Sequence, residues 1–453
     1  MKFGIAIVGF GVVGRGTAEL LDHSRELIKY QSGLDLEVVA ILDLRSPEKE
    51  RYRRIRYDSM EEILALPNVN LVVEAIGGCG AAKTFTEQAL MSGRSVVTSN
   101  KELVSKHGDE LTKLARNNQV QYLYEASVGG GIPLIRVLST SLLGNEIRSL
   151  RGILNGTTNF ILSHMASSSM EFAPALQEAV ARGYAELDPT DDIAGLDTRR
   201  KLAILLQIVT GLWLRPERIP VIGIEEIDAV DLDFAAANNL SLRLLAKYSQ
   251  GRQGAFSALV APHFLSDSSP LAMVNGVFNA LLLNGDFVGD VMLYGRGAGA
   301  QPTASAVVAD IINCLNGNHV EHLSPQTNRY TSMVNIDLYD QPISAIIRLN
   351  ASVDFEAIEK TLSDLGLDSA RLILSPDMQQ RRLTEHKYNW IVTRNRFPHS
   401  YDFSCPQLKE EDLVNCRIQP LTRTGKKEDW TWRHLEQLKR RLPPGAIASI
   451  VML

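Results

Sequence analysis

The sequence has few cysteines and no long apolar run. Four cysteines in 453 residues are too few and too scattered for a disulfide framework or a zinc site, and the nine histidines show no metal-ligand spacing. No apolar run approaches the roughly 18 to 20 residues of a membrane span, and no signal-peptide pattern opens the chain. We therefore expect a cytoplasmic protein with reduced thiols and no membrane contact.

The sequence also lacks an excess of positive charge. A net charge of −5 provides no field that would attract a polyanion, which argues against nucleic-acid binding. The hydrophobic fraction of 45% and the charged fraction of 22% are typical of a globular protein. The length predicts several domains.

The first 130 residues alternate apolar runs with stretches of helical spacing. The runs at 3–9, 36–43, 71–76 and 95–99 are continuous, as in strands buried on both faces. This pattern predicts an α/β domain over 1–130, a Rossmann-type doubly wound parallel sheet.

The rest of the chain predicts two further domains. A long helical stretch near 170–210 and short apolar strands predict an α+β domain over 131–325. The helix after the glycine-rich loop at Gly295 could close that domain. After a polar linker at 323–331, residues 330–453 predict a small α+β domain that folds separately, with a final edge strand at 445–453.

A glycine pattern follows the first predicted strand. Gly9, Gly11 and Gly14 form a GxGxxG sequence, which allows a tight turn and close approach of a pyrophosphate to a helix N-terminus. Asp43, at the end of the second predicted strand, could bind the ribose of NAD, whereas Arg45 could pair with the 2′-phosphate of NADP. Either residue could instead be a solvated loop residue. The predicted cofactor-binding residues of this part are Gly9, Phe10, Gly11, Val12, Val13, Gly14, Asp43 and Arg45.

Polar residues follow the predicted strand at 95–99. The carboxyl ends of strands in an open α/β sheet face the ligand crevice, so Asn100 and Lys101 should lie near the cofactor. Lys101 is either a solvated side chain or a fixed cation for an anionic substrate.

The segment from Gly183 is rich in carboxylates. Acids at the start of a helix are favoured by the helix dipole, and most of these acids need no other role. Asp197 and Lys201 lie four residues apart, so they share one helix face. They could form an ordinary salt bridge, or Asp197 could orient a proton-donating lysine.

Six segments together closely resemble the homoserine dehydrogenase family. They are VVEAIGG from Val72, TSNKELVSKHG from Thr98, YEASVGGGIPLI from Tyr124, RGILNGTTNFIL from Arg151, GYAELDPTDDIAGLDTRRKLAIL from Gly183 and GRGAGAQPTASAVVADI from Gly295. The resemblance runs in order over about residues 3–315. It implies a Rossmann domain, a catalytic and dimerisation domain, and interconversion of L-aspartate 4-semialdehyde and L-homoserine with NAD or NADP.

The resemblance also implies roles for individual residues. The proposed catalytic lysine is Lys201 with its partner Asp197, and Lys101 is a second active-site lysine. The implied substrate-binding residues are Glu186, Asp192, Asn155, Gly156, Thr157 and Thr158. Asn100, Lys101 and Gly297 are further predicted cofactor-binding residues. A monovalent cation, usually sodium, is implied at Glu125, Val128, Gly130 and Ile132, although a glycine-rich turn without metal is the alternative.

The chain departs from the family pattern mainly after residue 330. Many members end in a regulatory ACT domain, but the usual glycine-containing loop is missing here, so the tail is either ACT-like or an unrelated α+β unit that senses an amino acid or supports oligomers. Arg296 replaces a common proline. Two alternative functions are a catalytically silent nucleotide-binding regulator and a dehydrogenase of the same scaffold for another small semialdehyde or hydroxy acid. On family grounds we expect a homodimer or larger homo-oligomer that uses both nucleotides and prefers NADP.

Overall fold

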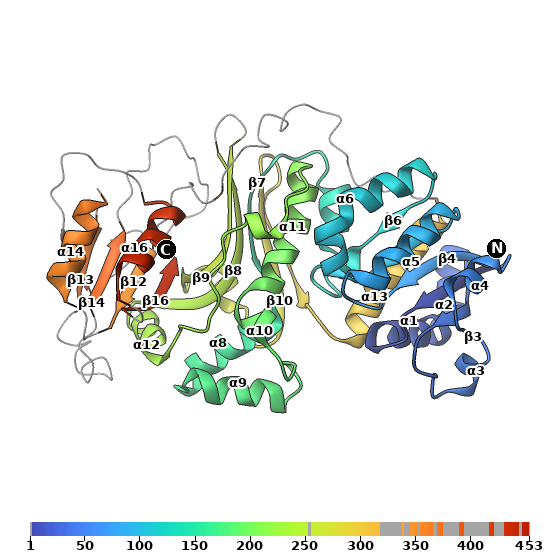
Figure 1. Ribbon diagram of the computed structural model, residues 1–453, viewed down its shortest axis with the longest axis horizontal. Coiled ribbons are helices and arrows are strands. Elements are labelled where there is room, and N and C mark those ends of the chain that lie inside the picture. The colour runs from blue at the N-terminus through green and yellow to red at the C-terminus, as the bar shows by residue number, and fades with distance from the viewer. Residues whose placement is uncertain are drawn as a thin grey trace. The chain divides into compact units, whose positions relative to one another are not determined.

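The computed structural model describes most of the chain and divides it into two compact units (Figure 1). The described residues are 2–251, 255–317, 338, 345–350, 354–365, 369–374, 389–393, 416–420, 430–443 and 446–452. The first unit comprises residues 1–146, 200–216 and 293–330, and the second comprises 147–199, 217–292 and 331–453. The linker expected at 323–331 lies outside the described residues.

The first unit contains a six-stranded parallel sheet with the strand order β3-β2-β1-β4-β5-β6. Its strands are β1 (Lys2–Val8), β2 (Asp35–Leu42), β3 (Arg56–Tyr57), β4 (Val69–Glu74), β5 (Ser95–Thr98) and β6 (Tyr122–Leu123). This order is that of a Rossmann sheet, which has its ligand crevice at the carboxyl ends of the strands. The predicted doubly wound parallel sheet is confirmed.

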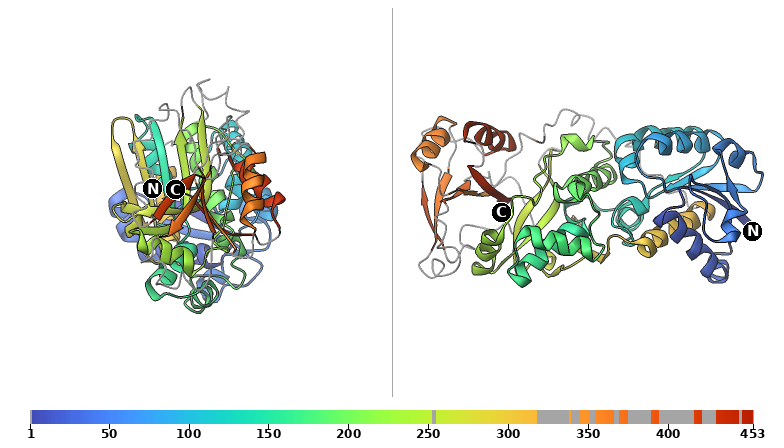
Figure 2. Two further views of the ribbon diagram at one scale, coloured as in Figure 1. Left: turned by 90° about the vertical axis from the view of Figure 1, so that its left-hand side faces the viewer. Right: turned by 60° about the horizontal axis from the view of Figure 1, so that its bottom comes forward.

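Helices cover both faces of this sheet (Figure 2). The helical elements of this unit are α1 (Val12–His23), α2 (Arg25–Ser32), α3 (Glu50–Arg53), α4 (Met60–Ala65), α5 (Gly80–Met91), α6 (Lys101–Asn117), η1 (Glu125–Ser127), α7 (Leu134–Arg136), the π-turn η2 (Val137–Ser141) and α13 (Ala300–Leu315). Helix α5 packs beside α6, and α13 packs beside α1.

The sequence predicted that the helix after Gly295 could close the second domain. Helix α13 instead packs in the first unit. Its apolar residues Val307, Val308 and Ile311 belong to the same buried cluster as Ile5 and Leu21 of the Rossmann unit. The chain therefore returns to the first unit near its residue 300, because the apolar face of α13 completes that core.

The second unit contains the strands of a ten-stranded mixed sheet with the order β11-β10-β7-β8-β9-β16-β12-β14-β13-β15. The strands are β7 (Ile147–Ile153), β8 (Leu240–Gln250), β9 (Phe256–Ser266), β10 (Phe278–Gly285), β11 (Gly289–Arg296), β12 (Ala345–Leu349), β13 (Ser369–Leu374), β14 (Asn389–Thr393), β15 (Cys416–Pro420) and β16 (Ile447–Met452). The helices are α8 (Gly156–Ser168), α9 (Phe172–Ala181), α10 (Thr190–Ile193), α11 (Leu196–Thr210), η3 (Pro216–Arg218), α12 (Ala229–Ala237), η5 (Pro270–Met273), α14 (Phe355–Asp364) and α16 (Trp432–Arg441). Helix α11 runs from the second unit into residues assigned to the first.

The C-terminal elements follow a β-α-β-β-α-β order with one added strand. Strands β16, β12, β14 and β13 are neighbours in that order, which is the ferredoxin-like arrangement, and β15 extends the sheet beside β13. The predicted strand, helix and strand before residue 375 are confirmed as β12, α14 and β13.

The final strand is not an edge strand. The prediction for 445–453 was wrong, because β16 lies between β9 and β12. Its residues Ser449 to Met452 are buried, so an interior position matches its apolar character. In the described part of the chain, no helix is both long and apolar enough to span a membrane.

Candidate active site

The glycine turn after β1 has the geometry that a dinucleotide phosphate requires. Gly9 has a φ of +93°, and a Cβ on Gly14 would lie 2.0 Å from the carbonyl oxygen of Gly9. A Cβ on Gly11, by contrast, would meet no atom within 4 Å. Gly11 caps α1 without any side-chain hydrogen bond, and Val12 beside it is 69% exposed. The helix N-terminus therefore has accessible N–H groups and open space in front of them, as an anion needs.

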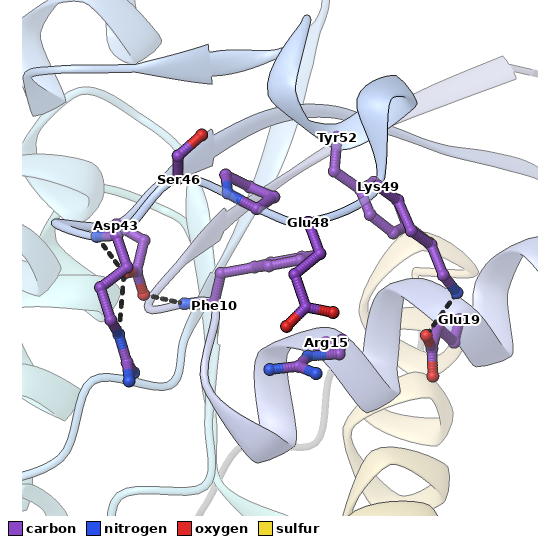
Figure 3. Close-up of a pocket in the computed structure, with 10 residues that line it drawn as sticks. Phe10, Arg15, Glu19, Asp43, Ser46, Glu48, Lys49 and Tyr52 are labelled. Atoms are coloured by element: carbon purple, nitrogen blue, oxygen red, sulfur yellow. Dashed lines mark hydrogen bonds and ion pairs between the residues drawn. The ribbon is translucent and has the colours of Figure 1, made fainter.

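Asp43, at the end of β2, holds this turn in place. One carboxylate oxygen accepts the N–H of Phe10 at 2.6 Å, and the other accepts the N–H of Arg45 at 2.8 Å (Figure 3). The guanidinium Nε of Arg45 lies 3.9 Å from Asp43, and the Arg45 side chain is 85% exposed. Asp43 thus fixes the backbone of both loops, and the Arg45 side chain extends toward solvent.

A pocket of about 180 Å³ opens beside Asp43. It is lined by Phe10, Arg15, Glu19, Asp43, Arg45, Ser46, Pro47, Glu48, Lys49 and Tyr52. The aromatic ring of Phe10 packs edge-on against Tyr52 at 5.0 Å between centroids. Lys49 is paired with Glu19 at 2.6 Å, and Figure 3 shows the Arg15 guanidinium extending from α1 toward Glu48. The pocket combines an apolar wall with both basic and acidic side chains, groups that can contact the ring and the ribose hydroxyls at the adenosine end of a nucleotide.

A buried hydrogen-bond network ends the neighbouring strands β4 and β5. Glu74 accepts the hydroxyl of Thr98 at 2.6 Å and the N–H of Ile76 at 2.8 Å. Thr98 in turn accepts the N–H of Asn100, whose side-chain amide donates to the Gly78 carbonyl at 2.7 Å. Burial raises the pKa of Glu74 above its usual value. The network fixes the loop after β4 at the sheet edge where Asn100 was expected.

Lys101 follows this network as the first residue of α6, half-buried. Asn100 caps the helix by accepting the N–H of Leu103 at 3.1 Å. The structure thus places Asn100 and Lys101 together at the carboxyl edge of the parallel sheet.

Asn155 joins two of the predicted acids. Its side-chain N–H groups donate to Asp192 at 2.6 Å and to Asp197 at 2.8 Å. Its side-chain oxygen caps α8 by accepting the N–H of Thr158 at 2.8 Å. Asp197 is buried and Asp192 is half-buried. One amide therefore orients both carboxylates.

The other predicted substrate-binding residues have separate roles around Asn155, Asp192 and Asp197. Thr157 donates to the Tyr184 carbonyl at 2.6 Å, which anchors the loop at 183–189. Glu186 lies on that loop with an exposed side chain. Gly156 is required because a Cβ there would lie 2.8 Å from the Val277 carbonyl oxygen. Asp192, Asp197 and Asn155 are thus in contact, whereas Glu186 is not bonded to them.

Lys201 lies one turn after Asp197 on α11 and is only 8% exposed. A lysine is rarely this buried unless its ammonium group is paired. The helix therefore presents an acid and a lysine four residues apart, as the spacing predicts.

The predicted cation turn contains a buried carboxylate. Glu125 accepts the N–H groups of Ile135 and Arg136 at 3.0 and 2.7 Å. Burial first, and then the charge of Asp310, raises the pKa of Glu125 to about 7. Burial likewise raises the pKa of Asp310 to about 6. The described residues contain no cluster of three His, Cys, Asp or Glu suited to a metal.

The oxygen donors that the family resemblance implies at this turn are one carboxylate and backbone carbonyls. The carbonyl groups belong to Val128, Gly130 and Ile132, and Val128 and Ile132 are buried. Hard oxygen donors with one formal charge fit a monovalent cation. A Cβ on Gly130 would lie 2.6 Å from the carbonyl of Gly297, so the structure brings the turn against the loop that holds Gly297. The Arg296 carbonyl in that loop accepts the N–H of Gly131 at 3.3 Å.

Sequence reasoning missed several of these residues. Glu74, Thr98 and Asp310 support the candidate sites from buried positions, and Arg15 and Lys49 line the pocket beside Asp43. A charged residue that ends the otherwise apolar strand β4 was the one visible signal for Glu74. Asp310 lies in a helix far along the chain, and nothing local connects it with Glu125.

Two family models match the chain. The model described as "Homoserine dehydrogenase, NAD binding domain" matches residues 9–125, and the model described as "Homoserine dehydrogenase" matches residues 133–312. The homoserine dehydrogenase of Lactococcus lactis is 39% identical over 345 residues, which are 74% of this chain and 80% of that protein. The homoserine dehydrogenase of Corynebacterium glutamicum is 37% identical over 91% of this chain and 93% of its own length.

Solved structures give the same relationship. A crystal structure of a homoserine dehydrogenase from Thiobacillus denitrificans has a TM-score of 0.78 and 27% identity, and covers 100% of this chain and 98% of that one. A hyperthermophilic archaeal homoserine dehydrogenase in complex with NADPH has a TM-score of 0.58 and 33% identity, and covers 70% of this chain and 98% of its own.

Proposed function

The chain belongs to the homoserine dehydrogenase family, and we propose that Lys201, Asp197 and Asn155 form the centre of its active site. Members are NAD(P)-dependent oxidoreductases that interconvert L-aspartate 4-semialdehyde and L-homoserine, a step toward threonine, methionine and isoleucine. The observation that supports the proposed site is the pair of hydrogen bonds from the Asn155 amide to Asp192 and Asp197. Asp197 lies one helical turn before the buried Lys201.

The nucleotide fits the Rossmann unit. The open space at Gly11 and the uncapped N-terminus of α1 suit the pyrophosphate, and the pocket lined by Phe10, Asp43 and Arg45 suits the adenosine end. The remaining proposed nucleotide-binding residues are Gly9, Val13, Gly14 and the loop that contains Gly297. When bound there, the nicotinamide would supply the hydride in aldehyde reduction and accept it in the reverse direction.

Lys201 is the proposed proton donor. Hydride addition to the aldehyde carbon develops negative charge on the oxygen, and a cationic acid must neutralise that charge. The Lys201 ammonium group gives its proton to that oxygen during reduction and takes it back during oxidation. Asp197, four residues earlier on the same helix face, is its proposed partner and limits its orientation.

Carboxylates and a second lysine bind the two ends of the substrate. Both substrates carry an α-amino and an α-carboxylate group, so acids and a cation are needed to fix them. We assign the amino or hydroxyl group of the substrate to Asp192 and Glu186, and we give Lys101 the role of a fixed cation for the carboxylate. Asn155 and Thr157 position these acids through the hydrogen bonds described above, and Thr158 and Gly156 shape the turn that carries them.

Further properties rest on family membership. A monovalent cation held by Glu125, Val128, Gly130 and Ile132 would brace the turn beside the Gly297 loop. We also propose a homodimer or larger homo-oligomer, dual nucleotide use with preference for NADP, an amino-acid effector and a cytoplasmic location. The thiols Cys79 and Cys314 are free, as is usual in a reducing compartment.

The function is tested by incubating the pure protein with aspartate semialdehyde and NADPH or NADH. We expect loss of reduced-nicotinamide absorbance and formation of homoserine. A protein that binds the nucleotide but forms no homoserine would contradict the proposal.

A further inference from the structure

A short segment connects the acid cluster to the C-terminal core. We call residues 219–224 the strap. Its Ile222 N–H donates to the Val260 carbonyl at 2.8 Å, and the Val260 N–H donates to the Pro220 carbonyl at 2.9 Å. Val221 and Val260 thereby form a parallel bridge along one edge of β9. Strand β16 pairs with the same strand at His263, so the strap and β16 follow one another along β9.

One side of the strap packs against the turn that carries the acids. Ile224 donates its N–H to the Ile193 carbonyl at 2.8 Å. A Cβ on Gly223 would lie 2.2 Å from that carbonyl oxygen, and a Cβ on Gly195 would lie 2.9 Å from the Val221 side chain. The fit is therefore tight at backbone level, directly after Asp192.

The other side of the strap belongs to the C-terminal core. Ile222, together with Leu259 of β9, packs against a buried cluster from the C-terminal elements. The cluster includes Ala345, Ile347, Ile358, Trp430, Leu435, Leu438 and Ile450. All of these side chains are at most 1% exposed, so the strap rests on a fully packed surface.

We propose that the strap is a positioning element for the substrate site, with the C-terminal core as its support. The chain of contacts runs from this core through Ile222 to Gly223, then to Ile193 and to Asp192, which Asn155 links to Asp197. Because a close-packed path transmits small shifts, loosening the strap at its core end should displace the acids. The inference rests on the proposed function in its use of these acids as substrate ligands.

The test is a cavity at the core end of the strap. Ile222→Ala removes contacts to the C-terminal core but does not substitute the acids, Asn155 or Lys201. We expect the KM for homoserine to rise at least about fivefold while the KM for the nucleotide stays near that of the wild type. Ile222→Val should retain most of the wild-type homoserine affinity, because valine keeps both γ-carbons of the isoleucine side chain and loses only the δ-methyl group.

The matched control is Ile358→Ala, which makes the same truncation in the same core from helix α14. This control should lower thermal stability at least as much as Ile222→Ala, because Ile358 is fully buried and Ile222 only partly, and it should leave the KM for homoserine unchanged. Amide hydrogen exchange gives a readout that does not depend on activity. The N–H of Ile224 in the strap donates to the Ile193 carbonyl next to Asp192, so its exchange rate reports how firmly the strap holds this turn. This N–H should exchange faster in Ile222→Ala than in Ile358→Ala.

The outcomes separate the two claims. Equal effects of both variants on KM and on Ile224 exchange would show that the strap is only part of the core, and the proposal would be wrong. Absence of homoserine oxidation in the wild type would contradict the proposed function, and the exchange comparison would still decide whether the strap holds the acid turn.

Discussion

The side chain of Asn155 makes two kinds of contact that a substitution can separate. Its oxygen caps α8, and its N–H groups donate to Asp192 and Asp197. Asn155→Ser keeps a capping oxygen and loses the two amide N–H donors that reach Asp192 and Asp197. We expect this variant to retain most of its thermal stability and to show a raised KM for homoserine and a lower kcat. Steady-state kinetics and thermal unfolding measure the two effects independently.

Asn155→Ala is the matched comparison, because it loses the cap as well. It should be less stable than Asn155→Ser by about 1 kcal/mol, the usual worth of a helix cap, with a similar kinetic defect. Wild-type kinetics for Asn155→Ser would show that the two acids need no bridging amide.

Arg45 is the residue on which nucleotide choice should depend. Its side chain is exposed beside the pocket, whereas the Asp43 carboxylate already accepts two backbone N–H groups. Arg45→Ala should lower kcat/KM for NADPH more than for NADH, because only NADPH has the 2′-phosphate. Arg54→Ala, exposed but outside the pocket lining, is the control. If nucleotide preference is unchanged in Arg45→Ala, Arg45 is a solvated surface residue.

Spacing and residue type predicted which residues to examine, but not all of their partners. The four-residue interval between Asp197 and Lys201 is local information, and α11 contains both residues. The contact from Asn155 to Asp192 spans 37 residues and the one to Asp197 spans 42, so only folding brings them together. Asp43 shows the same limit, because its backbone partner Phe10 lies 33 residues away.

At the scale of elements, continuous apolar runs were sufficient to predict β1, β2, β4 and β5. The two-residue strands β3 and β6 carry too short a pattern for that. The helical stretch near 170–210 is three helices, α9, α10 and α11, because the polar loop at 183–189 separates α9 from α10 and Gly195, with a φ of +74°, separates α10 from α11. The place of β16 depends on pairing with β9 and β12, which no local pattern contains.

Strand β9 carries a histidine that should make stability depend on pH. His263 is 3% exposed, and its Nδ1 lies 2.9 Å from the Ala261 carbonyl. Burial, with smaller contributions from Lys247 and Arg151, lowers the pKa of His263 to about 3. The unfolded chain then binds a proton below pH 6.5 that the folded chain does not bind, so stability falls as the pH falls.

We expect His263 to reduce the free energy of unfolding by about 2 kcal/mol between pH 7 and pH 5. His263→Gln should lack this component, and His23→Gln, at the exposed end of α1, should keep it. Denaturant unfolding of the three proteins at both pH values measures the difference. An equal loss in the wild type and in His263→Gln would show that His263 does not cause it.

At the scale of the whole molecule, the C-terminal region shares a core and a sheet with the domain before it. The sequence predicted a separately folding unit, but Ile222, Leu259 and Ala261 pack with the C-terminal side chains, and β16 pairs with β9. The buried Arg348 of β12 also pairs with Asp231 of α12 at 3.0 Å. The shared core and sheet depend on contacts between residues far apart in the sequence, such as Arg348 and Asp231, which are 117 residues apart. Composition along the chain cannot show such contacts.

Truncation after residue 325 should therefore damage the remaining protein. It would expose the apolar side chains named above, leave Asp231 without Arg348, and open an edge of β9. We expect a lower Tm and aggregation, measured by thermal unfolding and sedimentation. A truncated protein that is soluble and as stable as the full chain would show that the C-terminal region is an independent unit.

The central claim is that Lys201 transfers the proton during hydride transfer, and Lys201→Ala tests it most directly. Measured with aspartate semialdehyde and NADPH, its kcat should fall by roughly two to four powers of ten, the usual scale for loss of a general acid. The dissociation constant for NADPH, measured by titration, should stay close to that of the wild type, because the nucleotide pocket belongs to other residues. A Lys201→Ala protein with near-wild-type kcat would contradict the account.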